Sequence, residues 1–286
     1  MQFIELLQEN ATVFYCTVAF LSLCLGSFLN VVIYRLPMIM ENEFQTEAHA
    51  YLHPDTPPLE QPKFTLSYPA STCPKCQHKI RWYENIPLVS WLILLRGKCS
   101  GCKNPISIRY PFVELATMLC SLIIAWHFGP TLEAVFGLIF TWTLIALTGI
   151  DFDTQLLPDR LTYPLIGLGL AVNSYALYVS PTQAIWGALL GFLSLWSVAT
   201  LYKILRNREG MGAGDFKLLA ALGAWMGPSQ LPVIILLSSI VGAIIGIILL
   251  KVRKEDKPFA FGPYLAIAGW IAFIWGDPIM QAYLGK

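Results

Sequence analysis

The sequence predicts an all-α, multi-pass membrane protein with a zinc-binding loop region between its first and second membrane helices. Three observations lead to this fold class. The 286 residues are 56% hydrophobic and only 13% charged, with a mean hydropathy of +0.58, whereas soluble domains are roughly 45–50% apolar. The chain contains eight long apolar stretches. Two Cys-x-x-Cys pairs lie in the polar region after the first of these stretches.

The net charge of +1 excludes one class of partner. A nucleic-acid-binding chain is expected to carry a strong basic footprint. We therefore expect membrane lipid, and no nucleic acid, around this protein.

Apolar stretches of about 20 residues match a hydrocarbon core of about 30 Å. The eight stretches are expected to form transmembrane helices, and they cover residues 11–34, 112–128, 131–150, 161–179, 184–205, 216–226, 231–250 and 261–275. The sixth is short. It is a half-span, a tilted segment beside a cavity, or a helix that begins earlier, because irregular backbone at membrane depth needs protein or water around it.

The distribution of Lys and Arg predicts the orientation, because positively charged loops stay cytoplasmic. With eight spans, every Lys and Arg except Lys286 falls on one side, including the basic segment 251–257. Residues 1–10 lack Lys and Arg, so the first span is expected to be a retained helix and not a cleavable signal. We expect three parts: 1–36 as the first helix, 37–110 as a cytoplasmic zinc-binding region, and 111–286 as a seven-helix membrane catalytic domain.

Polar residues near the end of the first span are Ser27 and Asn30, which share one helix face. Such groups act either as contacts between helices or as the lining of a site. Residues 38–70 carry five acidic residues, a single Lys63 and five prolines, and this composition predicts an irregular loop. We assign it no chemistry, and we expect its two histidines, His49 and His53, to be solvated.

Two Cys-x-x-Cys pairs follow, separated by 22 residues, and their members are Cys73, Cys76, Cys99 and Cys102. Four thiolates at this spacing suit a tetrahedral structural zinc site. Disulfides are disfavoured in a reducing cytoplasmic loop, and a redox dithiol is disfavoured because there are two pairs. Four cysteines leave no open coordination position, so the metal should stabilise the loop and take no part in catalysis. His78 is left out of the ligand set.

The other three cysteines, Cys16, Cys24 and Cys120, lie within predicted spans. We interpret them as small packing residues.

Between the cysteine pairs, the apolar segment 86–95 is too short to cross a membrane. It either packs on the zinc module or lies at the lipid interface, where aromatic residues such as Trp91 are enriched. Farther along, Glu114 lies just inside the second span. A salt bridge with Arg109 and a contact with substrate are both open interpretations of this charge.

Two aspartates lie at the ends of apolar stretches. Asp151 ends the third stretch, and Asp215 follows Gly210, Gly212 and Gly214 at the start of the sixth. Glycine lets the backbone turn tightly and approach another chain closely, so Gly212 and Gly214 are expected to support the site. Two nearby carboxyl groups can share one proton and act as general acid and base. Of the nearby carboxylates, Asp153 is expected to point elsewhere and Asp159 to cap the next helix.

Other classes of function are compatible with membrane carboxylates. A secondary transporter would use them to carry protons or cations, but it predicts internal repeats, and we find none that convinces. A zinc-ribbon scaffold for secretion components would tolerate the loss of both aspartates.

Several motifs, in this order, resemble those of the type IV prepilin peptidases, also called leader peptidase/N-methyltransferases, a branch of the GxGD membrane aspartyl proteases. They are residues 26–30 through Pro37, the two cysteine pairs, residues 106–114, Asp151 with residues 157–159, and residues 212–215. Together they cover nearly the whole chain.

The resemblance implies a bifunctional enzyme of the bacterial inner membrane, with a periplasmic N-terminus and its zinc region and aspartates on the cytoplasmic side. Asp151 and Asp215 would be the catalytic pair. The substrates would be type IV prepilins and type II secretion pseudopilins, cut after the glycine that ends a short basic leader. The second reaction would methylate the new N-terminal amine with S-adenosylmethionine.

The cofactor site is harder to place, because the sequence has no Rossmann-type glycine fingerprint. Candidates for binding S-adenosylmethionine are polar groups of the first cytoplasmic region, namely Arg96, Gly97, Lys98 and Glu114. The oligomeric state does not follow from one sequence.

Overall fold

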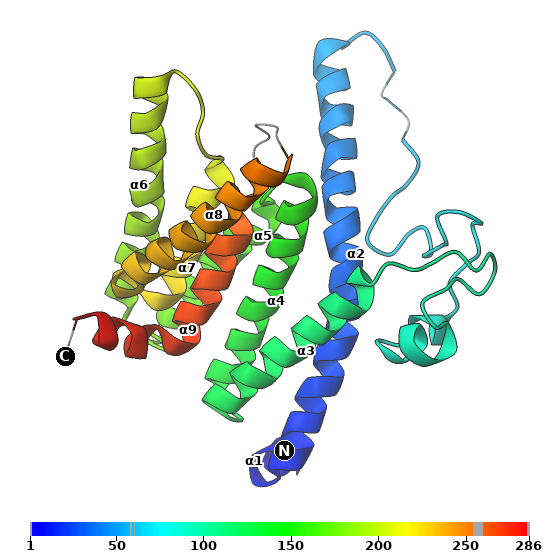
Figure 1. Cartoon of the computed structure of the whole chain (residues 1–286), viewed down its shortest axis with the longest axis horizontal. Helices are drawn as coiled ribbons and strands as arrows, with labels where there is room; N and C mark the ends of the chain where they lie inside the picture. The colour runs from blue at the N-terminus through cyan, green and yellow to red at the C-terminus, as the bar shows by residue number, and fades with distance from the viewer. Residues whose placement is uncertain (1, 58, 60, 254–259, 285–286) are drawn as a thin grey trace. The chain divides into compact units, whose positions relative to one another are not determined.

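The computed structural model describes residues 2–57, 59, 61–253 and 260–284, and these residues are mostly helical (Figure 1). The chain forms two compact units, residues 1–130 and 131–286. Residues 254–257 of the predicted basic segment, and Lys286, lie outside the described residues. The predicted division at residues 36 and 110 stays a prediction.

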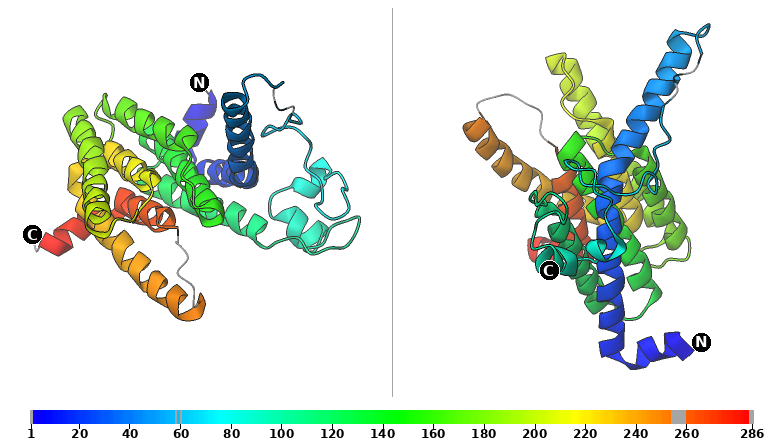
Figure 2. Two further views of the ribbon diagram at one scale, coloured as in Figure 1. Left: turned by 90° about the horizontal axis from the view of Figure 1, so that it is seen from above. Right: turned by 90° about the vertical axis from the view of Figure 1, so that its right-hand side faces the viewer.

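The first unit is built on one long helix. After α1 (Gln2–Glu9), the chain enters α2 (Ala11–Leu52), whose N-terminus is capped by the Asn10 side chain accepting the N–H of Val13. At 1.5 Å per residue, the 42 residues of α2 measure about 63 Å. That is about twice the hydrocarbon core of a bilayer, so α2 must continue well beyond the membrane (Figures 1 and 2).

The prediction of an irregular loop over residues 38–70 is wrong for its first part, because α2 continues to Leu52. Residues 38–52 are rich in good helix formers such as Glu, Gln, Met and Ala, and Gln45 donates to Glu41 one turn earlier. The run of prolines begins only at Pro54. The helix α2 therefore ends shortly before the first proline of this run. The earlier Pro37 lies within the helix.

Another long helix of this unit, α3 (Arg109–Phe128), crosses α2 closely at Gly26. A Cβ atom added at Gly26 would lie 2.7 Å from the Cα of Glu114. Nearby, the Asn30 amide donates to the carbonyls of Gly26 and Tyr110, each at 3.2 Å. Asn30 therefore acts as a contact between the two helices, which was one of the two roles expected for it.

The connection between α2 and α3 contains two short helical turns, η1 (Trp82–Asn85) and η2 (Ser90–Leu94). Its first part is fixed to α2 by Arg35, a buried guanidinium that donates to three backbone carbonyls, those of Thr65, Leu66 and Pro69.

The second unit is a bundle of helices (Figure 1). Its elements are α4 (Leu132–Thr154), α5 (Asp159–Asn173), α6 (Pro181–Arg206), α7 (Ala213–Met226), η3 (Pro228–Gln230), α8 (Leu231–Arg253) and α9 (Gly262–Leu284). Local signals set their ends. Ser180 and Gln183 form a capping box at the start of α6, and α7 stops at Gly227, whose φ of +76° suits glycine.

Each of the eight predicted spans coincides with a helix of the described chain. Six helices are long and apolar enough to cross a membrane: α2, α3, α4, α6, α8 and α9. The other two are shorter. The 14 residues of α7 measure about 21 Å, and α5 ends at Asn173, short of residue 179, where the fourth span was predicted to end.

Although α5 and α7 are short, they run the depth of the second unit side by side. At one end, Lys217 of α7 pairs with Asp159 of α5 at 2.6 Å. At the other end, the Asn173 amide donates to the carbonyls of Ala224 and Trp225. The two helices therefore run parallel to each other.

The core of the second unit surrounds α7, which has eleven of its fourteen residues buried. Trp225 is fully buried, lies 4.8 Å from the ring of Phe140, and donates its indole N–H to the Leu165 carbonyl. Backbone approaches backbone where α6 meets α7, because a Cβ atom at Gly187 would overlap the carbonyl of Gly223. A helix so enclosed by protein has little contact with lipid and need not match the bilayer in length.

We expect Gly187→Ala to lower the midpoint of thermal unfolding by roughly 3 to 10 °C, because an extra methyl group must force α6 away from α7. Gly167→Ala is the matched control, since a Cβ atom there meets nothing within 4 Å. Unfolding of both purified variants in one detergent tests this, and an unchanged midpoint for Gly187→Ala would contradict the close packing described here.

Candidate active site

Asp151 lies in the last turns of α4, where it is 4% exposed. The backbone N–H of Gly262, at the start of α9, donates toward its carboxylate. The carboxylate oxygen Oδ2 has no hydrogen-bond partner among the described residues. A buried carboxylate oxygen without a partner is costly.

Asp215 lies in the first turn of α7, and it is 8% exposed. This confirms the predicted position, at the point where the glycine-rich loop becomes a helix. Its backbone N–H contacts the carbonyl of Gly212 at 3.3 Å, which closes the turn. The charge of Asp151 acts on Asp215, so the two carboxyl groups are electrostatic neighbours.

Leu157 holds these segments together at one end of the bundle. A Cβ atom at Gly214 would lie 2.7 Å from the Cβ of Leu157, and one at Gly262 would lie 3.1 Å from its methyl groups and 2.6 Å from Asp151 Oδ2. The loop after α4 is thus enclosed between the starts of α7 and α9. The two aspartates, remote in sequence, lie at the same end of the second unit.

Sequence reasoning missed Gly262 and Tyr264 of this site. Tyr264 is 6% exposed, and it interacts electrostatically with Asp151. Both residues come from the first turn of α9, which looked like the start of an ordinary apolar span. The one signal available was Gly262 itself, the second residue of the predicted span 261–275.

The expectation that Asp159 caps α5 is wrong. The helix has no side-chain cap, and its N-cap residue is Pro158. Asp159 instead pairs with Lys217, whose ammonium also lies 4.9 Å from the ring centre of Tyr163. The contacts of Lys217 with Asp159 and Tyr163 therefore hold the start of α7 against the start of α5. Asp153 is exposed and is therefore outside the buried pair.

The four predicted cysteine ligands come together in the first unit. Their sulfur atoms all lie within 4.8 Å of one another, with Cys73 to Cys102 at 3.8 Å and Cys76 to Cys99 at 3.9 Å. A tetrahedral zinc site with bonds of about 2.3 Å places its sulfurs about 3.8 Å apart. The cluster therefore fits a metal ion, and its distances are too long for disulfides.

The two cysteine pairs form matching turns. In each turn, the backbone N–H of the first cysteine donates to the carbonyl of the residue five positions later. Cys73 donates to His78, and Cys99 donates to Asn104. A residue with positive φ directly follows each second cysteine, Gln77 at 58° and Lys103 at 58°. Hydrogen bonds from the backbone N–H groups of Cys76 and Lys75 lower the pKa of Cys73, whereas burial and the neighbouring thiols raise the pKa of Cys76.

His78, which was left out of the ligand set, has other partners. Its Nε2 lies 3.2 Å from the buried carboxylate of Glu84 and 3.0 Å from the hydroxyl of Ser100. The histidine therefore connects the turn after the first cysteine pair to the second pair.

The four candidates for binding S-adenosylmethionine differ in exposure. Arg96 and Gly97 have positive φ values of 49° and 69° and form a turn, on which Arg96 and Lys98 are exposed. Glu114 is buried, and its carboxylate accepts the backbone N–H of Leu88 at 2.8 Å. The role of these residues toward the cofactor stays a prediction, and we derive no step through it.

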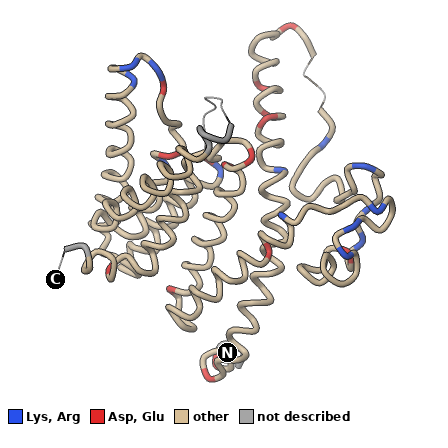
Figure 3. Tube along the Cα trace, in the orientation of Figure 1, with Lys and Arg blue, Asp and Glu red and all other residues tan. Residues whose placement is uncertain are grey.

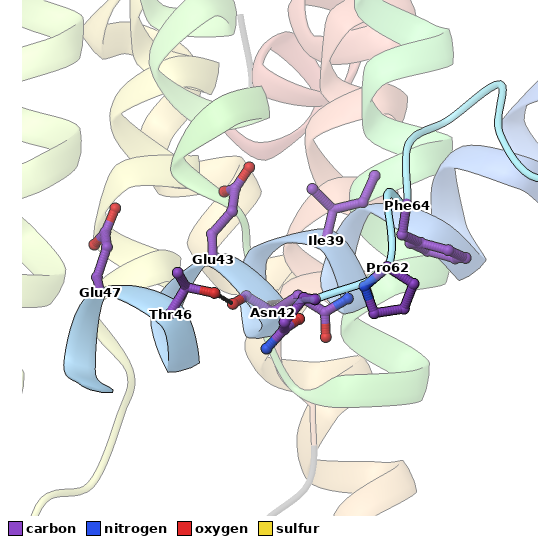
Figure 4. A pocket seen from close by; sticks show the side chains of 8 residues that line it. Ile39, Asn42, Glu43, Thr46, Glu47, Pro62 and Phe64 are labelled. Atoms are coloured by element: carbon purple, nitrogen blue, oxygen red, sulfur yellow. Dashed lines mark hydrogen bonds between the residues drawn. The ribbon is translucent and has the colours of Figure 1, made fainter. Parts of the chain in front are cut away.

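A pocket of about 290 Å³ lies elsewhere in the first unit (Figure 4). The end of α2 contributes Asn42, Glu43, Thr46 and Glu47, and the returning chain contributes Pro62 and Phe64. Its lining contains none of the predicted site residues, so we assign it no role.

The fold and the site define a multi-pass helical membrane protein that holds two buried carboxyl groups at one end of a helix bundle. Two family models match this chain. The Bacterial Peptidase A24 N-terminal domain matches residues 20–128, and the Type IV leader peptidase family matches residues 138–247. These two matches fall within the first and second units, respectively.

Curated relatives match over nearly the full length. Proteins named "Prepilin leader peptidase/N-methyltransferase" are 52% identical in Stutzerimonas stutzeri (98% of this chain and 97% of the relative), 51% in Aeromonas hydrophila (98% and 97%) and 52% in Pseudomonas aeruginosa (99% and 98%). The chain belongs to the type IV leader peptidase family.

The family membership and enzyme class predicted from the sequence are thereby confirmed. Six candidate spans and this family make the chain a multi-pass protein of the bacterial inner membrane. No solved structure matches the chain.

We expect the purified protein to contain close to one metal ion per chain, and Cys73→Ser to lose most of it, because serine cannot replace a thiolate ligand. Cys120→Ser is the control, since Cys120 lies within α3 and outside the cluster. Elemental mass spectrometry measures the metal content. Retention of the ion by Cys73→Ser would contradict this assignment.

Proposed function

We propose that this protein removes the leader from type IV prepilins and type II pseudopilins, cutting after a glycine with Asp151 and Asp215 as its catalytic pair. The observation that carries this proposal is the placement of two buried carboxyl groups, at the ends of α4 and α7, at one end of the bundle. The printed names of the relatives support the substrate class.

The chemistry follows from the pair. Two neighbouring carboxyl groups cannot both ionise cheaply, so they share one proton. The ionised member accepts a proton from a water molecule as the water attacks the scissile carbonyl. The protonated member donates to the carbonyl oxygen or to the leaving amine. Their titration belongs to the pair and not to either residue alone.

The surroundings of the pair support this mechanism. The carboxylate of Asp151 meets the N–H of Gly262, and its buried Oδ2 has no hydrogen-bond partner among the described residues. A water or a substrate that entered the site would supply that partner. The pairing of Lys217 with Asp159 fixes the start of α7, and with it the position of Asp215 two residues earlier. The position of each acid is thus set by neighbouring residues.

The orientation of the chain is part of the proposal. Because Lys and Arg stay on the cytoplasmic side, the aspartates and the cysteine cluster face the cytoplasm and the N-terminus faces the periplasm. We propose zinc as the metal of the cluster, held by Cys73, Cys76, Cys99 and Cys102, where it would stabilise the loop.

The second reaction is N-methylation of the new N-terminal residue, with S-adenosylmethionine as the methyl donor. The relatives' names support it. The exposed cations Arg96 and Lys98 stay our candidates for meeting the carboxylate of that donor.

We expect Asp151→Asn and Asp215→Asn each to reduce cleavage of a prepilin by at least 10²- to 10⁴-fold, the range typical of a lost general acid or base. Asparagine keeps the shape of the side chain but cannot exchange the proton. Asp153→Asn, at an exposed position, is the control and should cleave normally. Shortening of the substrate on a gel is the readout, and normal processing by either asparagine variant at 151 or 215 would refute the catalytic pair.

A matched pair of glycines tests the geometry. Gly214→Ala places a methyl group against Leu157, whereas a Cβ atom at Gly212 meets nothing within 4 Å, and Gly212 has an ordinary φ of −74°. We expect Gly214→Ala to slow cleavage at least tenfold, and Gly212→Ala to keep it within about twofold. Equal rates for the two variants would argue against close packing of Leu157 at the site.

A further inference from the structure

Residues 71–108, which we name the knuckle module, carry two surface features that neither the metal cluster nor peptide cleavage explains. One is a ridge of exposed apolar side chains. The other is a set of cations with no exposed carboxylate among them.

The apolar ridge consists of Val89, Leu92, Ile93 and Leu94, which are 44%, 59%, 67% and 52% exposed. The same segment has an inner face. Ser90 is buried, and Trp91 donates its indole N–H to the Ile106 carbonyl while its ring packs at Gly97. One face of the segment 86–95 therefore packs on the module, which was one of the two interpretations, and the other face is left uncovered by the described residues.

The ridge is tied to the point where α3 enters the membrane. The backbone N–H of Leu88, directly before the ridge, donates to the Glu114 carboxylate at 2.8 Å. Glu114 lies five residues into α3, a candidate membrane span. The start of α3 exposes further apolar side chains, with Ile108 at 72% and Phe112 at 68%. The ridge is thus tied to the N-terminal part of a candidate membrane span.

Nearly all charged residues of the module are basic (Figure 3). Its six cations are all exposed: Lys75, Lys79, Arg81, Arg96, Lys98 and Lys103. Its one acidic residue, Glu84, is buried and accepts the backbone N–H of Arg81 at 2.8 Å. The surface of the module is therefore strongly positive.

We propose that the knuckle module docks on the surface of an anionic bilayer, with the apolar ridge inserted at the boundary between headgroups and acyl chains. An apolar face beside exposed Lys and Arg is the combination that binds such interfaces, and each cation near an anionic leaflet adds to the attraction. The bond from Leu88 to Glu114 holds the ridge at the depth where α3 begins. This inference does not depend on the proposed catalytic activity.

The test uses the full-length protein in nanodiscs that contain phosphatidylcholine with or without phosphatidylglycerol. A benzophenone amino acid replaces Ile93 in one variant and Ser71, an exposed polar residue of the same module, in a matched control. After illumination, mass spectrometry identifies what each probe has attached to. We expect lipid adducts at position 93 at least fivefold above those at position 71.

The charge contribution is tested by lipid composition and by substitution. Removing phosphatidylglycerol, or introducing Lys79→Gln together with Lys103→Gln, should lower the lipid adducts at position 93 several-fold, and raised salt should do the same. Metal content confirms that each variant keeps its folded module. Adducts at position 93 to protein, whether to the same chain or to a second copy, would overturn the proposal, as would equal lipid labelling at positions 71 and 93.

Discussion

The close packing of α7 is the constraint on which the second unit depends. The helix α6 approaches α7 so closely that there is no room for a Cβ atom at the crossing. Gly187 packs there against the backbone of Gly223, and Gly191 packs against the backbone of Leu219. Trp225 fills the space at one end of the helix, and polar groups such as the Asn173 amide satisfy backbone carbonyls there. Because backbone groups cannot be left unpaired in an apolar medium, a helix too short to span the membrane is stable only inside such an enclosure.

This enclosure also determines the chemistry of the site. The first turn of α7 carries Asp215 into a region bounded by Leu157 and the start of α9, where Asp151 is already buried. Both carboxyl groups are buried there, and burial strengthens interactions between charges. The packing that encloses the short helix α7 therefore also brings the two aspartates close together.

The first unit is stabilised in a different way. Its loop has few buried apolar residues, and four cysteines cluster there around a site that suits a metal ion.

The sequence predicted much of this by local rules. Apolar length identified the membrane helices, because a bilayer imposes a fixed thickness. Cysteine spacing identified the ligand set, because two tight turns deliver four thiolates whatever lies between them. The errors occurred where composition alone was ambiguous. Residues 38–52 looked like part of a loop, yet they extend α2, and Asp159 looked like a helix cap, yet its partner is a lysine 58 residues away.

By itself, then, the sequence determined the helical membrane class, the four cysteines that cluster together and the two aspartates at helix ends, since each depends on short-range spacing or on the thickness of the bilayer. Only the tertiary structure decided that Gly262 and Leu157 border the carboxylates, that Gly214 needs to be glycine while Gly212 has free space, and that Glu114 binds a backbone N–H. These features depend on contacts between segments that are far apart in the sequence. Local composition does not predict such contacts.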